Sequence, residues 1–214
     1  MSNIITCNTN QSTMFGIKKK VHFTKANDFL HQKIEELFFL MQEALLTKEA
    51  ANFKLSDKAV SAILYEYLFF LIYTLHTTEQ YKSNEHLDDL LKRFTSFFKL
   101  PLKLESNEYD KRFPEIDEVM DFAVTHAQTS GGIGSAILTY ILHNLSDSIL
   151  NEITITRDNK LEKMFGVNLV GSDIEDGKTK ILVYLPMLIG ILFGEMNTIF
   201  AKDAESYFKK HKIA

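Results

Sequence analysis

The segment TSGGIGSA, residues 129–136, is the densest group of glycines in the chain and the first candidate for chemistry. A glycine-rich loop that opens a helix can hold a phosphate on its free backbone amides. A Walker A loop needs a lysine that is missing here, and a dinucleotide fingerprint needs glycine where this chain has Ile137. Both motifs also follow a strand, whereas the preceding residues have a helical period. We therefore predict that Gly131 and Gly132 form a hinge between two helices, whose exposed amides make them candidate ligand-binding residues.

A polar stripe follows this cluster. Its members recur at helical spacing and are Tyr140, His143, Asn144, Asp147 and Asn151. A carboxylate one turn from a histidine could orient the imidazole as a general base or share a metal with it. The same spacing is typical of an ordinary solvent-facing pair. The chain has no HExxH or ExxH pattern, so we predict no metal site and keep Tyr140, His143 and Asp147 only as candidate ligand-binding residues.

Glu66 is the third candidate, because it stands among Tyr65, Tyr67, Phe69 and Phe70 in an apolar segment. Burial would raise its pKa and would require a hydroxyl or cationic partner. A buried carboxylate can anchor a ligand, but it can also reach the edge of the bundle or be satisfied by a tyrosine. We predict that Glu66 is a candidate ligand-binding residue.

Other catalytic and metal-binding patterns are missing from the sequence. The acidic segment 172–177 fails as a calcium loop, because Ile174 and Val183 stand where oxygen ligands are needed. The single cysteine, Cys7, cannot form an internal disulfide or a cysteine-based zinc site. We assign no catalytic residue and no cofactor, and whether the chain is an enzyme is left open, with the balance against it.

The apolar periodicity predicts an all-α, single-domain bundle of about six main helices. The expected helices cover 26–48, a segment that begins after Ser56 and Asp57, a segment from 85 that Pro101 ends, 114–126, a segment from the glycine cluster to 152, 179–201 and a short terminal helix at 203–211. The second and sixth helices are expected at the centre. Residues 153–177 break the pattern and admit a small two-stranded ribbon of 153–156 with 167–170. We divide the chain into a polar N-terminal arm, 1–24, and a helical domain, 25–214.

Charge and hydropathy bear on partners and location. The net charge is −4, and the only dense basic run is Lys18 to Lys20, so we predict no nucleic-acid binding. Residues 181–194 are uncharged but shorter than the roughly 20 residues that cross a bilayer. The second helix carries Glu66, a costly group in lipid, so we predict no membrane span. The first residues contain no signal-peptide pattern, and we expect a soluble, cytoplasmic protein.

These observations favour a non-catalytic intracellular interaction or regulatory domain, whose partner is another protein or a second copy in a homodimer. One alternative is a domain that binds an apolar small molecule or acyl chain in the bundle core, with Glu66 as the polar anchor. Another is an enzyme with a site at His143 and Asp147. We identify no motif that resembles a known family.

Overall fold

Seven helices and four short strands make up the part of the chain that the structure describes. The computed structural model describes residues 18–46, 53–78, 80–81, 83–94, 97–98, 108–126, 130–150, 152, 154–155 and 190–214. Its elements are β1 (Lys19–Val21), α1 (Phe23–Leu46), β2 (Phe53–Lys54), α2 (Asp57–His76), α3 (Asn84–Arg93), α4 (Glu108–His126), α5 (Ser130–Asn144), α6 (Asp147–Leu150), β3 (Thr154–Ile155), α9 (Ile191–Lys210) and β4 (His211–Ile213). The all-α prediction is confirmed.

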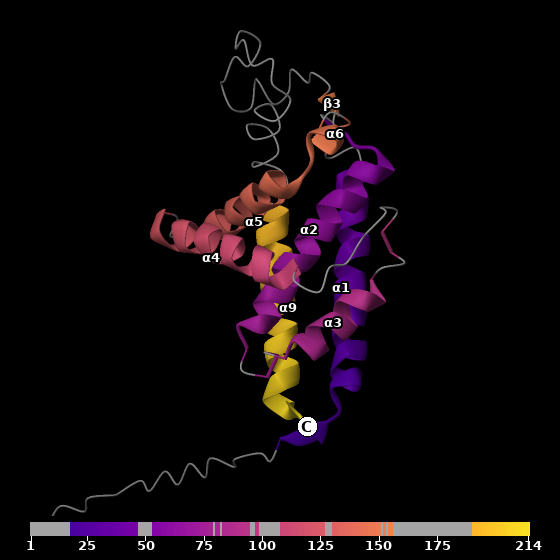
Figure 1. The fold of residues 1–214 in the computed structure, drawn as a ribbon, viewed down its shortest axis with the longest axis vertical. Coiled ribbons are helices and arrows are strands. Elements are labelled where there is room, and N and C mark those ends of the chain that lie inside the picture. Colours follow the sequence, from indigo (N-terminus) through magenta and orange to yellow (C-terminus); the bar gives the residue numbers. More distant parts are fainter. Residues whose placement is uncertain are drawn as a thin grey trace, which may run out of the picture.

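The long helices α1 and α9 lie along the long axis of the molecule, and α4 and α5 lie across it (Figure 1). At one end of the molecule, β1 pairs in parallel with β4, with Val21 opposite Ile213. Because β1 leads into α1 and β4 follows α9, these two helices run antiparallel. The pairing therefore sets α1 and α9 side by side.

The predicted inner face of the first helix is confirmed. All six of its members are buried, namely Leu30, Ile34, Leu37, Phe38, Met41 and Leu45. Helix α2 is buried on almost every side, as its nearly uniform apolar composition predicts. Its start is fixed by Ser56, whose hydroxyl accepts a hydrogen bond of 3.1 Å from the amide of Ala59. Helix α2 therefore forms the centre of the core.

Two glycines let α5 and the start of α9 meet at backbone distance. A Cβ atom placed on Gly134 would lie 1.6 Å from the carbonyl oxygen of Gly190, where no atom fits. Gly134 of α5 therefore lies directly opposite Gly190, the residue before α9. This close contact joins α5 to the start of α9.

The limits of the third and fourth helices differ from the sequence-based expectation. Helix α3 ends at Arg93, well before Pro101, and the chain turns so that Phe98 is buried. Helix α4 begins at Glu108, so Pro114 lies inside it. Tyr109 is buried in the added first turn, and this tertiary contact holds residues that look like a polar connection in helical form.

The fifth helix is shorter than expected. It ends at Asn144, and a separate turn of helix, α6, follows. The carbonyl of Ser146 accepts the amides of Ile149 and Leu150 at 2.9 Å and 3.0 Å, which starts this new helix. The segment expected to form the first strand of a ribbon, β3, pairs antiparallel with β2, with Phe53 opposite Ile155. Residues 167–170, its expected partner, lie outside the described residues.

The two ends of the chain also differ from the prediction. The sixth and terminal helices are one helix, since α9 runs unbroken to Lys210 with Phe200, Ala204 and Phe208 on a single buried stripe. Residues 211–213 then form a strand, not the last turn of a helix. Within the predicted arm, β1 is ordered and paired, whereas residues 1–17 and 179–189 lie outside the described part.

Candidate functional site

Glu66 lies at the centre of α2 and is 4% exposed. Burial is the main reason why its pKa is raised, to about 7, because a carboxylate loses its hydration there. The charge of Arg112 and a hydrogen bond from Tyr140 work in the opposite direction and offset part of this effect. Of the alternatives that the sequence leaves open for Glu66, the structure shows the buried one, with protein partners.

Arg112, from α4, is the partner that the sequence did not reveal. Its Nη1 atom lies 3.0 Å from Oε2 of Glu66, and its side chain is 17% exposed. The guanidinium also lies over the ring of Phe69, 5.1 Å from its centroid, where the ring face attracts a cation. Tyr140, from α5, completes the group by donating its hydroxyl to Oε2 of Glu66 at 3.4 Å. Three helices thus meet at one carboxylate.

A second layer of polar groups surrounds this pair. Arg112 donates to the side-chain oxygen of Asn144, whose amide donates to Glu115 at 3.1 Å and to the carbonyl of Tyr140 at 3.1 Å. Glu108 lies 3.4 Å from Nε of Arg112. The guanidinium therefore lies between two carboxylates, Glu66 and Glu108. Burial lowers the pKa of Arg112, but the charges of Glu66, Tyr140 and Glu108 together outweigh this effect and raise it. The network ties α4 and α5 to α2.

The polar groups of this network are already bonded to one another, which limits the chemistry they can perform. Both donors that reach the Glu66 carboxylate come from the protein, and the network contains no histidine or thiol. Among the described residues, no three His, Cys, Asp or Glu side chains gather to hold a metal ion. In this arrangement the polar groups hold helices together, and a ligand-binding role for Glu66 and Tyr140 stays a prediction.

The glycines at the start of α5 do not lie at the hinge that the sequence suggested. Gly131 and Gly132 are within the first turn of α5, which begins at Ser130. The connection to α4 is instead made by residues 127–129, which lie outside the described part. The helical setting agrees with the rejection of a phosphate loop, and ligand binding at the two glycines stays a prediction.

His143 and Asp147 are not brought together on one helix. Helix α5 ends between them, at Asn144, so their four-residue spacing no longer corresponds to one helical turn. Both side chains are exposed. Within the described chain, no hydrogen bond or ion pair joins them. The alternative in which Asp147 orients His143 as a general base has no support in this geometry, and a ligand-binding role for the two residues stays a prediction.

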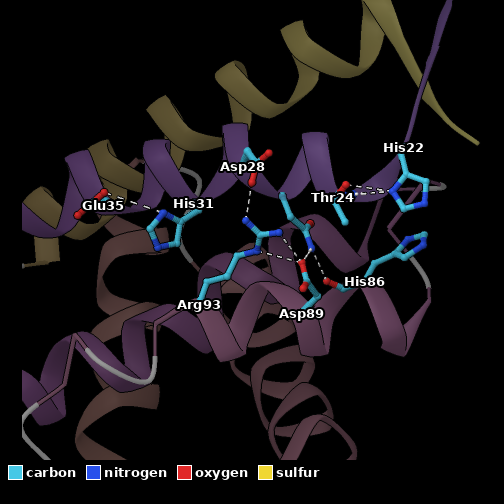
Figure 2. Close-up of polar contacts among 9 residues, drawn as sticks. His22, Thr24, Asp28, His31, Glu35, His86, Asp89 and Arg93 are labelled. Carbon is cyan, nitrogen blue, oxygen red and sulfur yellow. Dashed lines mark hydrogen bonds and ion pairs between the residues drawn. The ribbon is translucent and has the colours of Figure 1, made fainter.

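A second polar cluster joins α1 to α3 near the β1–β4 end, and Figure 2 shows Arg93 pointing between Asp28 and Asp89. The guanidinium lies 2.6 Å from Asp28 and 2.9 Å from Asp89. Asn27, which is buried, donates to Asp89 at 2.7 Å and to the carbonyl of His86 at 3.0 Å. Burial raises the pKa of Asp89, but the hydrogen bonds from Asn27 and Arg93 together lower it to below its usual range. This cluster is a helix-to-helix contact at the surface.

One open pocket lies away from both clusters, where the end of α2 faces α9. Its volume is about 380 Å³, and its lining includes Thr74, Thr77, Ala204 and Phe208. Glu66 is not part of the lining. The pocket therefore does not match the expected ligand site in the core, which was to have Glu66 as its anchor.

Arg112 lies between Pro101 and residue 114, outside the helices that the apolar periodicity predicts, so the sequence does not indicate its role. The signal that could have found it is the spacing of Glu108, Arg112 and Glu115, which places one cation between two acids on a single helical face. Arg112 could then have been offered to Glu66 as the cationic partner that a buried carboxylate requires.

One described helix, α2, is long and apolar enough to cross a membrane, but 78% of its apolar window is buried inside the structure, as in the core helix of a globular protein. No family model matches the chain, and no similar curated protein or solved structure was found.

Proposed function

We propose that this chain is a non-catalytic helical interaction domain with a regulatory role, soluble and cytoplasmic, and that α1 and α9 carry its contact surface. The observation behind this proposal is the exposure of large apolar side chains on these two helices. Leu40 and Ile199 are 50% and 47% exposed, whereas Phe39, 57% exposed, packs edge-on against the ring of Phe97 after α3. Exposed apolar groups that gather on one face are typical of protein contact sites.

The polar clusters support the same conclusion. The carboxylate of Glu66 is engaged by Arg112 and Tyr140, and the guanidinium of Arg93 is engaged by two aspartates. Groups that are paired within the fold stabilise the helix arrangement and are not free to act on a substrate. Leu40 and Ile199 have no comparable contact among the residues that the structure describes, so binding is the role that fits them.

Site-specific photo-crosslinking in cells tests this proposal. A benzophenone side chain replaces Leu40 in one variant and Ile199 in a second. In the control variant it replaces Glu118, an exposed residue of α4. Helix α4 lies across the long axis of the molecule, away from the proposed α1–α9 surface (Figure 1). We expect a discrete protein adduct from the first two positions and none from Glu118. Equal labelling at all three positions, or no adduct at any, would overturn the proposal.

A further inference from the structure

Two exposed apolar residues, Leu40 of α1 and Ile199 of α9, lie on one face of the molecule. An ion pair of 3.7 Å between Lys33 and Asp203 fixes how the two helices align. Leu40 follows Lys33 by two turns, about 10 Å along α1, and Ile199 precedes Asp203 by about 6 Å on α9. Since the helices are antiparallel, both displacements point in the same direction. Leu40 and Ile199 therefore lie on the same side of the ion pair, on neighbouring helices.

Helix α9 extends this face into an apolar stripe. Leu192, Met196 and Ile199 recur at the spacing of one helical face, in line with Asp203. Leu192 and Met196 pack against the core on one side and keep part of their surface accessible. The stripe therefore presents apolar surface over about two turns of helix.

Charges of opposite sign flank the stripe. Glu195 precedes Ile199 by four residues and Lys202 follows it by three, and both side chains are exposed. Neither has an ion-pair partner among the residues that the structure describes. They are seven residues apart on one helix, about 10 Å along its axis, so they do not neutralise each other within the chain.

This pattern is self-complementary. If two copies of α9 pack antiparallel around a two-fold axis at Ile199, Glu195 of one copy lies about 6 Å from the axis and Lys202 of the other about 4.5 Å on the same side. Two intermolecular ion pairs then form on either side of an apolar centre, as in antiparallel helix pairs. A membrane surface fits less well, since Glu195 and Glu43 would face its anionic headgroups.

We propose that the α1–α9 face is the interface of a homodimer whose two-fold axis passes near Ile199. This inference rests on the proposed function and names its partner as a second copy of this chain. Leu40 then extends the apolar contact from the neighbouring helix, beside the paired stripes of α9. The dimer buries the exposed apolar residues that the monomer leaves in water.

Sedimentation equilibrium of the purified full chain, across a wide range of concentrations, tests the dimer. We expect a monomer–dimer equilibrium whose dissociation constant rises at least tenfold in Ile199→Asp. The control is Glu118→Lys, a charge change on an exposed α4 position, which should leave the constant unchanged. A chain that stays monomeric at all concentrations overturns the inference, as does a dimer that Ile199→Asp does not weaken.

A charge exchange identifies the two-fold geometry. Lys202→Glu places like charges opposite each other, and so does Glu195→Lys, so each should weaken the dimer about threefold to tenfold. The variant that carries both changes restores opposite charges across the axis and should recover most of the affinity. Rescue cannot arise within one chain, because the two positions are two turns apart. Additive losses in the double variant overturn this arrangement.

The two proposals fail separately. If the purified chain is monomeric while benzophenone at Leu40 or Ile199 captures a different protein, the homodimer is wrong and the interaction domain stands. If the adducts have twice the mass of the chain, both stand. If neither position yields an adduct and the chain is monomeric, both are overturned.

Discussion

The Arg112–Glu66 pair and the Arg93–Asp28 pair join helices with the same two chemical groups in different surroundings. Glu66 is 4% exposed and lies in the core, whereas the side chain of Asp28 is 66% exposed. The pKa of Glu66 is raised above its usual value and that of Asp89, in the outer cluster, is lowered. The comparison shows that burial, more than the identity of the partner, decides how such a pair affects stability.

The physical reason is the competition between hydration and attraction. A carboxylate taken from water into the core loses several kcal/mol of hydration, which one guanidinium only partly returns. A carboxylate at the surface keeps most of its water, so its partner acts through a weak, screened attraction. The buried pair therefore makes the packing of α2 against α4 depend on both charged residues. The exposed pair contributes only a small amount to the free energy of unfolding.

The largest effect is expected from Arg112→Met. This change leaves the Glu66 carboxylate buried without a cation, and we expect a loss of about 3–5 kcal/mol in the free energy of unfolding above pH 7. Urea denaturation measures it, with Arg93→Met as the matched control in the outer cluster. Equal losses in the two variants would contradict the comparison.

A double variant sharpens the same test. Arg112→Met combined with Glu66→Leu removes both charges and keeps apolar volume in the core. Replacing a buried pair by apolar groups is often neutral or stabilising, so the double variant should be more stable than Arg112→Met alone. A double variant that is less stable than either single variant would show that shape, not charge, controls this site.

The two clusters should also respond to pH with opposite sign. The raised pKa of Glu66 means that the folded state binds a proton more tightly, so its contribution to stability falls as pH rises from 4.5 to about 7. The size of this fall is about 3 kcal/mol. The lowered pKa of Asp89 gives the reverse, a contribution that is lost in acid as pH falls through its folded pKa.

Thermal unfolding at a series of pH values separates these contributions. Glu66→Gln should remove the decline between pH 4.5 and about 7, because the amide does not titrate. Asp89→Asn should instead reduce the loss of stability in acid. It should leave unchanged the fall in stability between pH 4.5 and about 7 that Glu66 causes. A Glu66→Gln profile parallel to that of the unchanged protein would contradict the raised pKa.

A smaller effect is expected from Arg93→Ala. Its partners are open to solvent, so we expect a loss of about 1 kcal/mol or less at low salt. The loss should shrink further at an ionic strength of about 1 M, where charges at the surface are screened. Chemical denaturation at low and at high salt measures this loss. If the loss were as large at high salt as at low salt, the Arg93 cluster would behave like the buried Glu66 pair.

The smallest effects are expected from His143→Ala and Asp147→Ala. Both residues are exposed and lie on either side of the end of α5, so each change should alter stability by less than about 0.5 kcal/mol. The dimer affinity should also be unaffected, since neither residue is on the α1–α9 face. A large loss from either change would show that these residues take part in a contact beyond the two clusters.

Much of the helical frame could be predicted from the chain alone. The period of Leu30, Ile34 and Met41 defines one buried face, and Ser56 begins α2, because both signals act within a few residues. The burial of Glu66 was also open to prediction, since the residues around it are apolar on every side of α2. These local patterns could not predict that the partner of Glu66 is Arg112, on another helix.

Local patterns failed wherever a distant contact decided the outcome. Residues 108–113 are polar enough for a loop, but Tyr109 and Arg112 are held in α4 by contacts with α2. The stripe from Tyr140 to Asp147 has helical spacing, but a new helix start at Ser146 interrupts it. Each failure reflects energy from residues far away in sequence, which a short window does not contain.

The sequence by itself determined the helical class, the buried stripes and the central place of α2, because periodicity and capping depend on neighbouring residues. Only the tertiary structure decided that Arg112 meets Glu66, that Gly134 meets Gly190, and that Leu40 and Ile199 share one exposed face. Those outcomes depend on how the helices cross and align. That arrangement minimises the free energy of the whole core, and no single segment specifies it.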